Sequence, residues 1–414
     1  MHVCGFAKLK EKMPSTTNQF SAADSALGYL YQARLGLLWA LKRLKDSSDF
    51  VVSLETIDDV TFETNGRPDE LLQTKHHLTR PAALTDASPD LWKSLRVWFE
   101  GVSAKTIPPQ THLYLVTTSA AGVGSAAAKL RQNDRDVASA LATLETTAQT
   151  SGSQENASAY AVFLAASVSE RRTVLERVVI LDRTPTIGNL NDELKVELFW
   201  ATERRHQDAF LLYLEGWWLR RVVTQLARIN VGDRILGGEL ESQMSDLREQ
   251  FKQDALPIAD DLLNFSPDDA AIAAHEDSLF VRQLELAKAG KRRVAAAVRD
   301  YYRAFEQRSR WLRHDLLMVG DLDTYERRLT QEWELFFEAR RDELGDDAAD
   351  QEKVEAARRV LEWAERICIP IRPAVTEPFV TRGSLHILAD DLRVGWHVEF
   401  HARLAHLLER EASA

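Results

Sequence analysis

Cysteine is nearly absent from this 414-residue sequence, whose two cysteines, Cys4 and Cys368, lie far apart. A disulfide framework is therefore excluded, and we expect the protein in a reducing, cytoplasmic compartment. Long apolar runs are missing as well. The nearest, LGYLYQARLGLLWAL at 27–41, has helical spacing and is interrupted by Arg34. The sequence therefore predicts neither a signal peptide nor a membrane span.

Net positive charge is also lacking, because 52 lysines and arginines face 63 aspartates and glutamates, a formal net charge of −11. This acidity argues against indiscriminate binding to nucleic acid or anionic membranes, so any site for a polyanion must be local. The first 45 residues meet that condition with seven basic side chains against two acidic ones, although a solvated terminus can have the same composition. No GxxxxGKS/T loop occurs, so the chain is not expected to hydrolyse ATP itself.

What the sequence does contain is a series of short elements near its start. Apolar residues at helical spacing predict a helix over 21–45. The alternating stretch that follows predicts three strands, over 50–55, 59–64 and 69–76. The dipeptide Asn65-Gly66 predicts a hairpin between the last two strands. A second helix that begins at Pro89 and a further strand over 111–119 complete a mixed α/β core.

The remaining sequence is mostly helical in pattern. Residues 120–158 are rich in Ala, Ser, Thr and Gln and predict a loop or surface insert. A short strand followed by a turn is expected within 177–190. Long helices are expected over 191–253 and 275–368, and the prolines and glycine of 368–384 predict a break in the helical pattern.

The stretch DELLQTKHHL at 69–78 places an amide and an ammonium group on one strand face, at Gln73 and Lys75. The predicted hairpin brings these side chains close to Asp59, with Glu55 four residues before it. Carboxylate and amide oxygens are the ligands that Mg²⁺ or Mn²⁺ prefers, so we expect Asp59, Glu55 and Gln73 to bind such an ion. Lys75 would position the attacking water, and the whole cluster suits phosphodiester hydrolysis.

An acidic residue followed by Gln-x-Lys resembles the PD-(D/E)xK nuclease superfamily, in the subgroup whose second half reads Gln-x-Lys. With GYLYQ at 28–32 and LETIDDVTFE at 54–63, the order is similar to the nuclease domain of CD-NTase-associated double-strand DNA endonucleases and Lamassu-type effectors. The matching residues are Gly28, Tyr29, Gln32, Glu55, Asp59, Gln73 and Lys75. The resemblance implies an α/β restriction-endonuclease-like domain over 1–190 that cleaves double-stranded DNA with Mg²⁺ or Mn²⁺. Gln32 and His77 are candidate supporting residues.

A second resemblance concerns the C-terminal part. YYRAFEQRSRWLRHDLLMVGDLDTYERRLTQEWELFF at 301–337 and TRGSLHILADDLRVGWHVEF at 381–400 resemble the C-terminal domain of ABC three-component systems. This implies a helical partner-interaction domain over 270–414, which follows a helical middle region over 191–265. The implied partners are a small middle subunit and an SMC/Rad50-like ATPase. Together the two resemblances imply an effector of bacterial anti-phage or anti-plasmid defence, with a homo-oligomer as its active state and no role at a membrane.

Several alternatives remain open from the sequence. The nuclease-like domain could be a non-catalytic adaptor that binds nucleic acid, or it could cleave RNA with the same residues. Glu63 is an alternative second metal ligand in place of Glu55. The group Trp217, Trp218, Arg220 and Arg221 fits either stacking on nucleic acid or helix packing. Three histidines, His386, His397 and His401, fit either a zinc site or structural roles.

Overall fold

The computed structural model describes residues 22–76, 83–133, 135–227, 233–345 and 347–404. The chain forms two compact units, one of Met1–Glu197 with Glu215–Glu241 and the other of Leu198–Leu214 with Ser242–Ala414. The predicted helical middle region, 191–265, thus contributes to both units. No helix in the described part of the chain is long and apolar enough to cross a membrane.

A mixed six-stranded sheet forms the centre of the first unit, with the strand order β7-β5-β3-β2-β1-β8. Strands β1, β2, β3 and β8 pair in antiparallel fashion, whereas β3, β5 and β7 are parallel. The strands are β1 Val51–Leu54, β2 Val60–Thr64, β3 Arg67–Lys75, β5 His112–Thr117, β7 Val178–Leu181 and β8 Ile235–Leu236. A second, parallel pair consists of β4 Ala83–Leu84 and β6 Ala120–Ala121.

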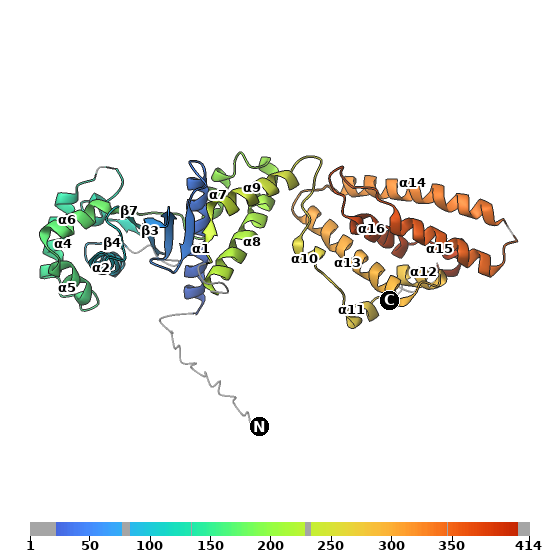
Figure 1. Cartoon of the computed structure of the whole chain (residues 1–414), viewed down its shortest axis with the longest axis horizontal. Coiled ribbons are helices and arrows are strands. Elements are labelled where there is room, and N and C mark those ends of the chain that lie inside the picture. Colours follow the sequence, from blue (N-terminus) through green and yellow to red (C-terminus); the bar gives the residue numbers. More distant parts are fainter. Residues whose placement is uncertain (1–21, 77–82, 134, 228–232, 346, 405–414) are drawn as a thin grey trace, which may run out of the picture. The chain divides into compact units, whose positions relative to one another are not determined.

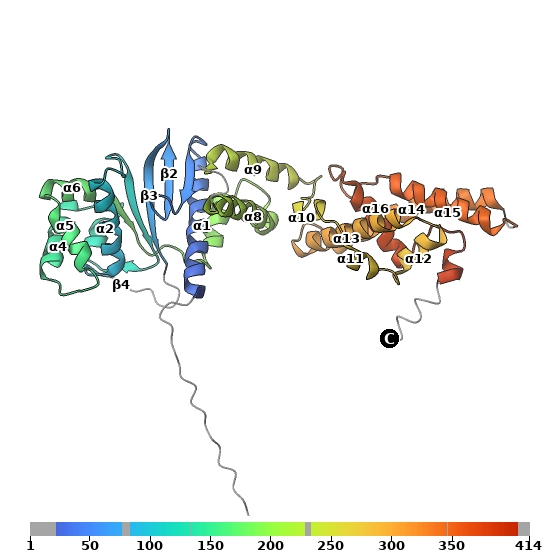
Figure 2. The ribbon, with the colours of Figure 1, turned by 60° about the horizontal axis from the view of Figure 1, so that its bottom comes forward.

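Helices cover both faces of this sheet. In Figures 1 and 2, α2, α4, α5 and α6 lie on one side of the sheet and α1 lies on the other. Trp92, Trp98 and Phe163 belong to the buried core between the sheet and the first group. The helices are α1 Ala22–Leu44, α2 Pro89–Ser103, α3 Ala126–Lys129, α4 Val137–Thr150, α5 Ala157–Ala165, α6 Val168–Arg177, α7 Leu190–Glu197 and the second half of α8 Gln207–Leu226.

The predicted order of helix, three strands, helix and strand is confirmed, except that the short strand β4 lies between the third strand and the second helix. The Asn65-Gly66 turn joins β2 to β3, and both residues have positive φ angles (53° and 71°), as a tight hairpin turn requires. The prediction of a loop over 120–158 is wrong, because α4 lies within it. Asp136 caps α4 by accepting a hydrogen bond from the Ser139 backbone N–H.

The second unit is helical in its described residues. Helix α16 packs against α12 and α13, and α14 packs against α15. The elements are η1 Arg204–His206, α9 Gly237–Gln250 (which begins in the first unit), α10 Asp260–Leu263, α11 Asp269–Ala273, α12 Leu279–Leu286, α13 Lys291–Arg313, α14 Val319–Leu344, α15 Asp350–Arg366 and α16 Pro378–Asp390. The break predicted over 368–384 is too long, because α16 begins at Pro378, a residue type that the first helical turn accepts.

Candidate active site

A tight connection between β1 and β2 carries the acidic residues. The backbone N–H of Glu55 donates to the carbonyl oxygen of Asp59 (3.1 Å), and Leu54 pairs with Val60 beyond it. Glu55 has φ of 51°, in the left-handed region that non-glycine residues adopt at a cost of about 1 kcal/mol. Such local strain is concentrated at functional sites.

The register of the hairpin places Asp59 beside the end of β3. Val60 pairs with Leu72, so the residue before β2 lies next to Gln73 and Thr74. One carboxylate oxygen of Asp59, Oδ2, accepts hydrogen bonds from the backbone N–H (2.7 Å) and the hydroxyl (2.9 Å) of Thr74. These two bonds fix the orientation of the carboxylate.

A chain of hydrogen bonds joins Asp58 to Lys75. The Asp58 carboxylate accepts from the indole of Trp98 (2.9 Å), from its neighbour's backbone N–H (3.0 Å) and from the amide nitrogen of Gln73. The amide oxygen of Gln73 accepts from Lys75 Nζ (3.1 Å). Because the carboxylate is an acceptor and the ammonium a donor, only this orientation of the amide satisfies both.

Burial shapes the chemistry of these acids. Asp58 is buried, and desolvation raises its pKa from 3.8 to about 6, opposed by the hydrogen bonds from Trp98 and Gln73. Although Glu55 is exposed, partial desolvation and then repulsion from Asp59 raise its pKa. A hydrogen bond from Gln32 and the charge of Lys75 oppose this shift.

The structure brings together five of the six candidate residues named from the sequence: Glu55, Asp59, Gln73, Lys75 and Gln32. The sixth, His77, lies outside the described residues. The alternative ligand Glu63 lies at the other end of β2, where it forms an ion pair with Arg234.

Three contributors to the site were not assigned from the sequence. Asp58 accepts a hydrogen bond from the Gln73 amide and so anchors it. Thr74 and Trp98 were not considered at all. The period-two pattern of β3 gives no signal for Thr74, since its side chain lies opposite that of Gln73. Trp98 is 40 residues from Asp58, and no local pattern links the two.

The donor set fits a hard divalent cation. Glu55 and Asp59 are neighbouring carboxylates, and a cation would relieve their mutual repulsion. Gln32 Oε1 is buried without a hydrogen-bond partner among the described residues, so this oxygen beside Glu55 is available as a metal ligand. The amide oxygen of Gln73 already accepts from Lys75, so its role as a ligand depends on its second lone pair and stays a prediction.

The tryptophan–arginine group has a packing role. Trp218 is buried and donates its indole N–H to the carbonyl oxygen of Ala33 (2.7 Å). Arg221 binds Asp233 and Glu239. The packing alternative is therefore confirmed for Trp218, whereas Arg221 forms ion pairs within the chain.

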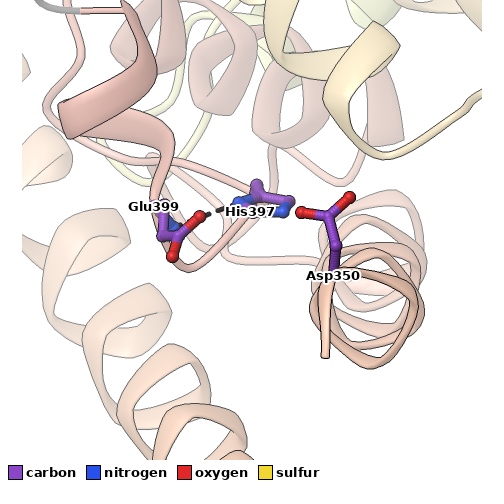
Figure 3. A group of neighbouring side chains, drawn as sticks. All are labelled: Asp350, His397 and Glu399. Carbon is purple, nitrogen blue, oxygen red and sulfur yellow. Dashed lines mark hydrogen bonds between the residues drawn. The ribbon is translucent and has the colours of Figure 1, made fainter. Parts of the chain in front are cut away.

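A second cluster of titratable groups lies in the second unit (Figure 3). Asp350, His397 and Glu399 each place one ligand atom within 4.8 Å of the others. Cationic side chains already neutralise the carboxylates, because Arg403 donates to both acids (2.6 Å) and Lys353 Nζ donates to Glu399 (2.7 Å). Hydrogen bonds from Lys353 and Arg403 lower the pKa of Glu399 to about 2. A metal ion would have to displace these partners, so we interpret the cluster as structural.

The three histidines do not form the alternative zinc site. His397 accepts from the Glu399 backbone N–H through Nδ1 and precedes the helical turn that contains His401, so the two are not on successive turns of one helix. His386 is buried in α16 beside Trp396, and desolvation lowers its pKa to about 4. It is therefore neutral at physiological pH.

Comparison with known proteins identifies the C-terminal part. Residues 280–404 match the family model for C-terminal domain 7 of the ABC-three component (ABC-3C) systems. The match confirms the resemblance noted for 301–337 and 381–400, supports membership of the chain in an ABC-three component system, and indicates a partner within a multi-subunit assembly. No curated protein matches the chain.

Proposed function

We propose that the chain is the effector nuclease of an ABC-three component defence system, a metal-dependent enzyme that cleaves double-stranded DNA. The observation that carries the proposal is the convergence of Glu55, Asp59, Gln73 and Lys75 at one end of the β2–β3 hairpin. The resemblance to restriction-endonuclease-like domains supports it. The C-terminal domain match supports the membership of the system.

The chain's own residues have distinct tasks in this proposal. Glu55 and Asp59 would hold Mg²⁺ or Mn²⁺, with Gln73 as a further oxygen donor. The bound ion would lower the pKa of a water molecule and stabilise developing negative charge. Thr74 holds the Asp59 carboxylate in place.

Lys75 supplies the positive charge of the site. Gln73 accepts from its ammonium group and so fixes where that charge lies. There it would orient the nucleophilic water and bind a phosphate oxygen whose charge increases in the transition state. Asp58 acts one step further away by holding the Gln73 amide.

Partners and state of assembly belong to the same proposal. A small middle subunit and an SMC/Rad50-like ATPase would bind the chain and restrain cutting, and a homo-oligomer would be the active form. The net charge of −11 accords with an enzyme that does not engage chromosomal DNA unprompted.

The test is cleavage of linear double-stranded DNA in the presence of Mg²⁺ or Mn²⁺. We expect Asp59→Ala and Lys75→Ala each to slow cutting by about 100-fold or more, because each removes a group that acts on the transition state. Lys93→Ala is the matched control, since Lys93 is an exposed lysine of α2 paired with Glu155.

Three other outcomes of the cleavage assay would contradict the proposal. Cutting that survives both site substitutions would refute the assigned site. Silence of the wild type, at raised protein concentration and with the partner subunits present, would favour a non-catalytic adaptor. Faster cleavage of RNA than of DNA, lost on the same substitutions, would show that RNA and not DNA is the substrate.

A further inference from the structure

A pocket of about 450 Å³ lies between α14 and α15 in the second unit. One wall is aromatic: the rings of Phe336 and Trp363 stack with centroids 5.3 Å apart and planes 13° apart. The guanidinium of Arg340 lies 5.2 Å from the Phe336 ring centroid. We name this feature the arginine–aromatic pocket, and its lining includes Phe336, Arg340, Arg359, Glu362, Trp363 and Arg366.

The charges of this pocket are unbalanced. Three arginines line it against one glutamate. Arg340 binds Glu343 through Nη2 (2.7 Å), but its Nε is buried without a hydrogen-bond partner among the described residues. Arg359 and Arg366 are exposed and form no ion pair with any residue in the described part of the chain. The pocket therefore presents two guanidinium groups, those of Arg359 and Arg366, that have no ion pair among the described residues.

Guanidinium groups bind carboxylates through paired hydrogen bonds, and a stacked aromatic wall favours an apolar side chain next to them. We propose that the arginine–aromatic pocket receives an acidic segment of a partner protein, with carboxylates on Arg359 and Arg366 and an apolar side chain against Trp363. The pocket lies within residues 280–404, the domain that indicates a multi-subunit assembly. The inference rests on the partner subunits of the proposed function and not on its nuclease chemistry.

The surrounding acids favour a protein over a nucleic acid as the occupant. Glu362 lines the pocket itself. Arg340 and Arg359 also line an adjoining pocket, together with the acids Glu343, Glu352 and Glu355. A nucleic acid carries a continuous row of phosphates and would pass these carboxylates, with like-charge repulsion at each. A single acidic segment places its few carboxylates on the arginines alone.

The experiment measures binding of the full chain to each of the other two purified subunits of its system. The test variant is Arg359→Glu/Arg366→Glu. The control is Arg327→Glu/Arg341→Glu, which makes the same change in net charge at two exposed arginines of α14. We expect the test variant to weaken binding to one subunit by about 100-fold, and the control to change it by about twofold or less. The affinity of Arg359→Lys/Arg366→Lys for this subunit should lie between those of the wild type and the test variant, because lysine keeps the charge but lacks the paired donors.

Four outcomes would overturn the inference. Equal binding by the test and control variants would show that the pocket is not the contact, while leaving the partnership intact. Loss of binding to a short DNA duplex, with subunit binding retained, would assign the pocket to nucleic acid. Loss of self-association alone would assign it to a second copy of the chain. A wild type that binds neither subunit would refute the partnership itself, and DNA cleavage, assayed separately, would show whether the nuclease proposal survives.

Discussion

Gln73 connects a buried carboxylate to the cationic side chain of the candidate site. Its nitrogen donates to Asp58 and its oxygen accepts from Lys75, so both ends of one amide are engaged. Asp58 in turn receives the Trp98 indole from α2. The position of the Lys75 charge therefore depends, through Gln73, on Asp58, which does not need to touch substrate. In this arrangement Asp58 is a positioning residue, and Gln73 positions Lys75 in addition to its proposed role as a metal ligand.

Replacement of Gln73 by methionine tests this role. Methionine has a similar length but neither donates to Asp58 nor accepts from Lys75, so the ammonium loses its anchor and the proposed metal ion loses one oxygen ligand. We expect kcat to fall by about 100-fold with little change in DNA affinity, because a misplaced charge mainly affects the transition state. Single-turnover cleavage and DNA binding assays would separate the two effects. Equal cutting by Gln73→Met and the wild type would refute a positioning role.

The raised pKa of Asp58 predicts a pH-dependent stability. Because its pKa is about 6 in the folded chain against 3.8 ordinarily, the folded state binds the proton more tightly than the unfolded state. The stability that this proton provides is present below about pH 4 and is lost as the pH rises through about 6. A shift of about two units corresponds to about 3 kcal/mol.

Asp58→Asn removes this titration while it keeps the shape of the side chain. Its free energy of unfolding relative to the wild type should therefore rise between about pH 4 and about pH 7. Urea unfolding of both proteins across this pH range measures the difference between their free energies of unfolding. The contributions of the other titrating groups cancel in this difference. A difference that does not vary with pH would contradict the burial of an ionisable Asp58.

Elements differed in how well the sequence predicted them. The β2–β3 hairpin was predictable because alternation and the Asn65-Gly66 turn are local signals, and the hairpin alone brings Asp59 to Gln73. Helix α4 was missed because its buried positions include small side chains, Ala140 and Ala148, in a stretch rich in Ala, Thr and Ser. The role of Asp58 could not be predicted, because it depends on tertiary packing that brings α2 to the β1–β2 connection.

Gly383 of α16 lies where this helix packs closely against α13. A Cβ atom there would lie far inside van der Waals contact with the Asp300 carbonyl oxygen and the Ala304 side chain of α13. Both obstacles belong to a rigid helix, so α16 would have to move away. We expect Gly383→Ala to lower the free energy of unfolding by about 2–3 kcal/mol, measured by chemical denaturation.

The matched control is Gly36→Ala in α1. There a Cβ would lie 3.5 Å from Trp218 and 3.6 Å from Val60, which is ordinary contact. Since alanine favours helix over glycine by about 1 kcal/mol, stability should be unchanged or slightly higher. A Gly383→Ala protein as stable as Gly36→Ala would contradict the close packing of α16 on α13.

At the scale of the whole molecule, the chain passes between its two units more than once. After Leu198–Leu214 in the second unit, Glu215–Glu241 returns to the first. This returning segment completes the first unit, since Gln225 bonds to both the backbone N–H and the carbonyl oxygen of Leu54, and β8 pairs with β1. Arg234 neutralises the buried Glu63 at the opposite end of β2 from the candidate site. The unit that carries the site thus depends on residues beyond the boundary at 190 that the sequence suggested.

Truncation compares the two boundaries. We expect a fragment of residues 1–241 to unfold cooperatively, with a thermal transition close to that of the same unit in the full chain. A fragment of residues 1–190 lacks Trp218, β8 and Arg234, so it exposes the edge of β1 and leaves the Glu63 charge unpaired. It should therefore unfold at a lower temperature or aggregate, as circular dichroism and light scattering would show.

In the 1–241 fragment, Arg234→Ala alone should account for part of this loss of stability, because it removes the ion pair and leaves the strand in place. A 1–190 fragment as stable as the longer one would place the boundary of the domain that carries the candidate site at 190 after all.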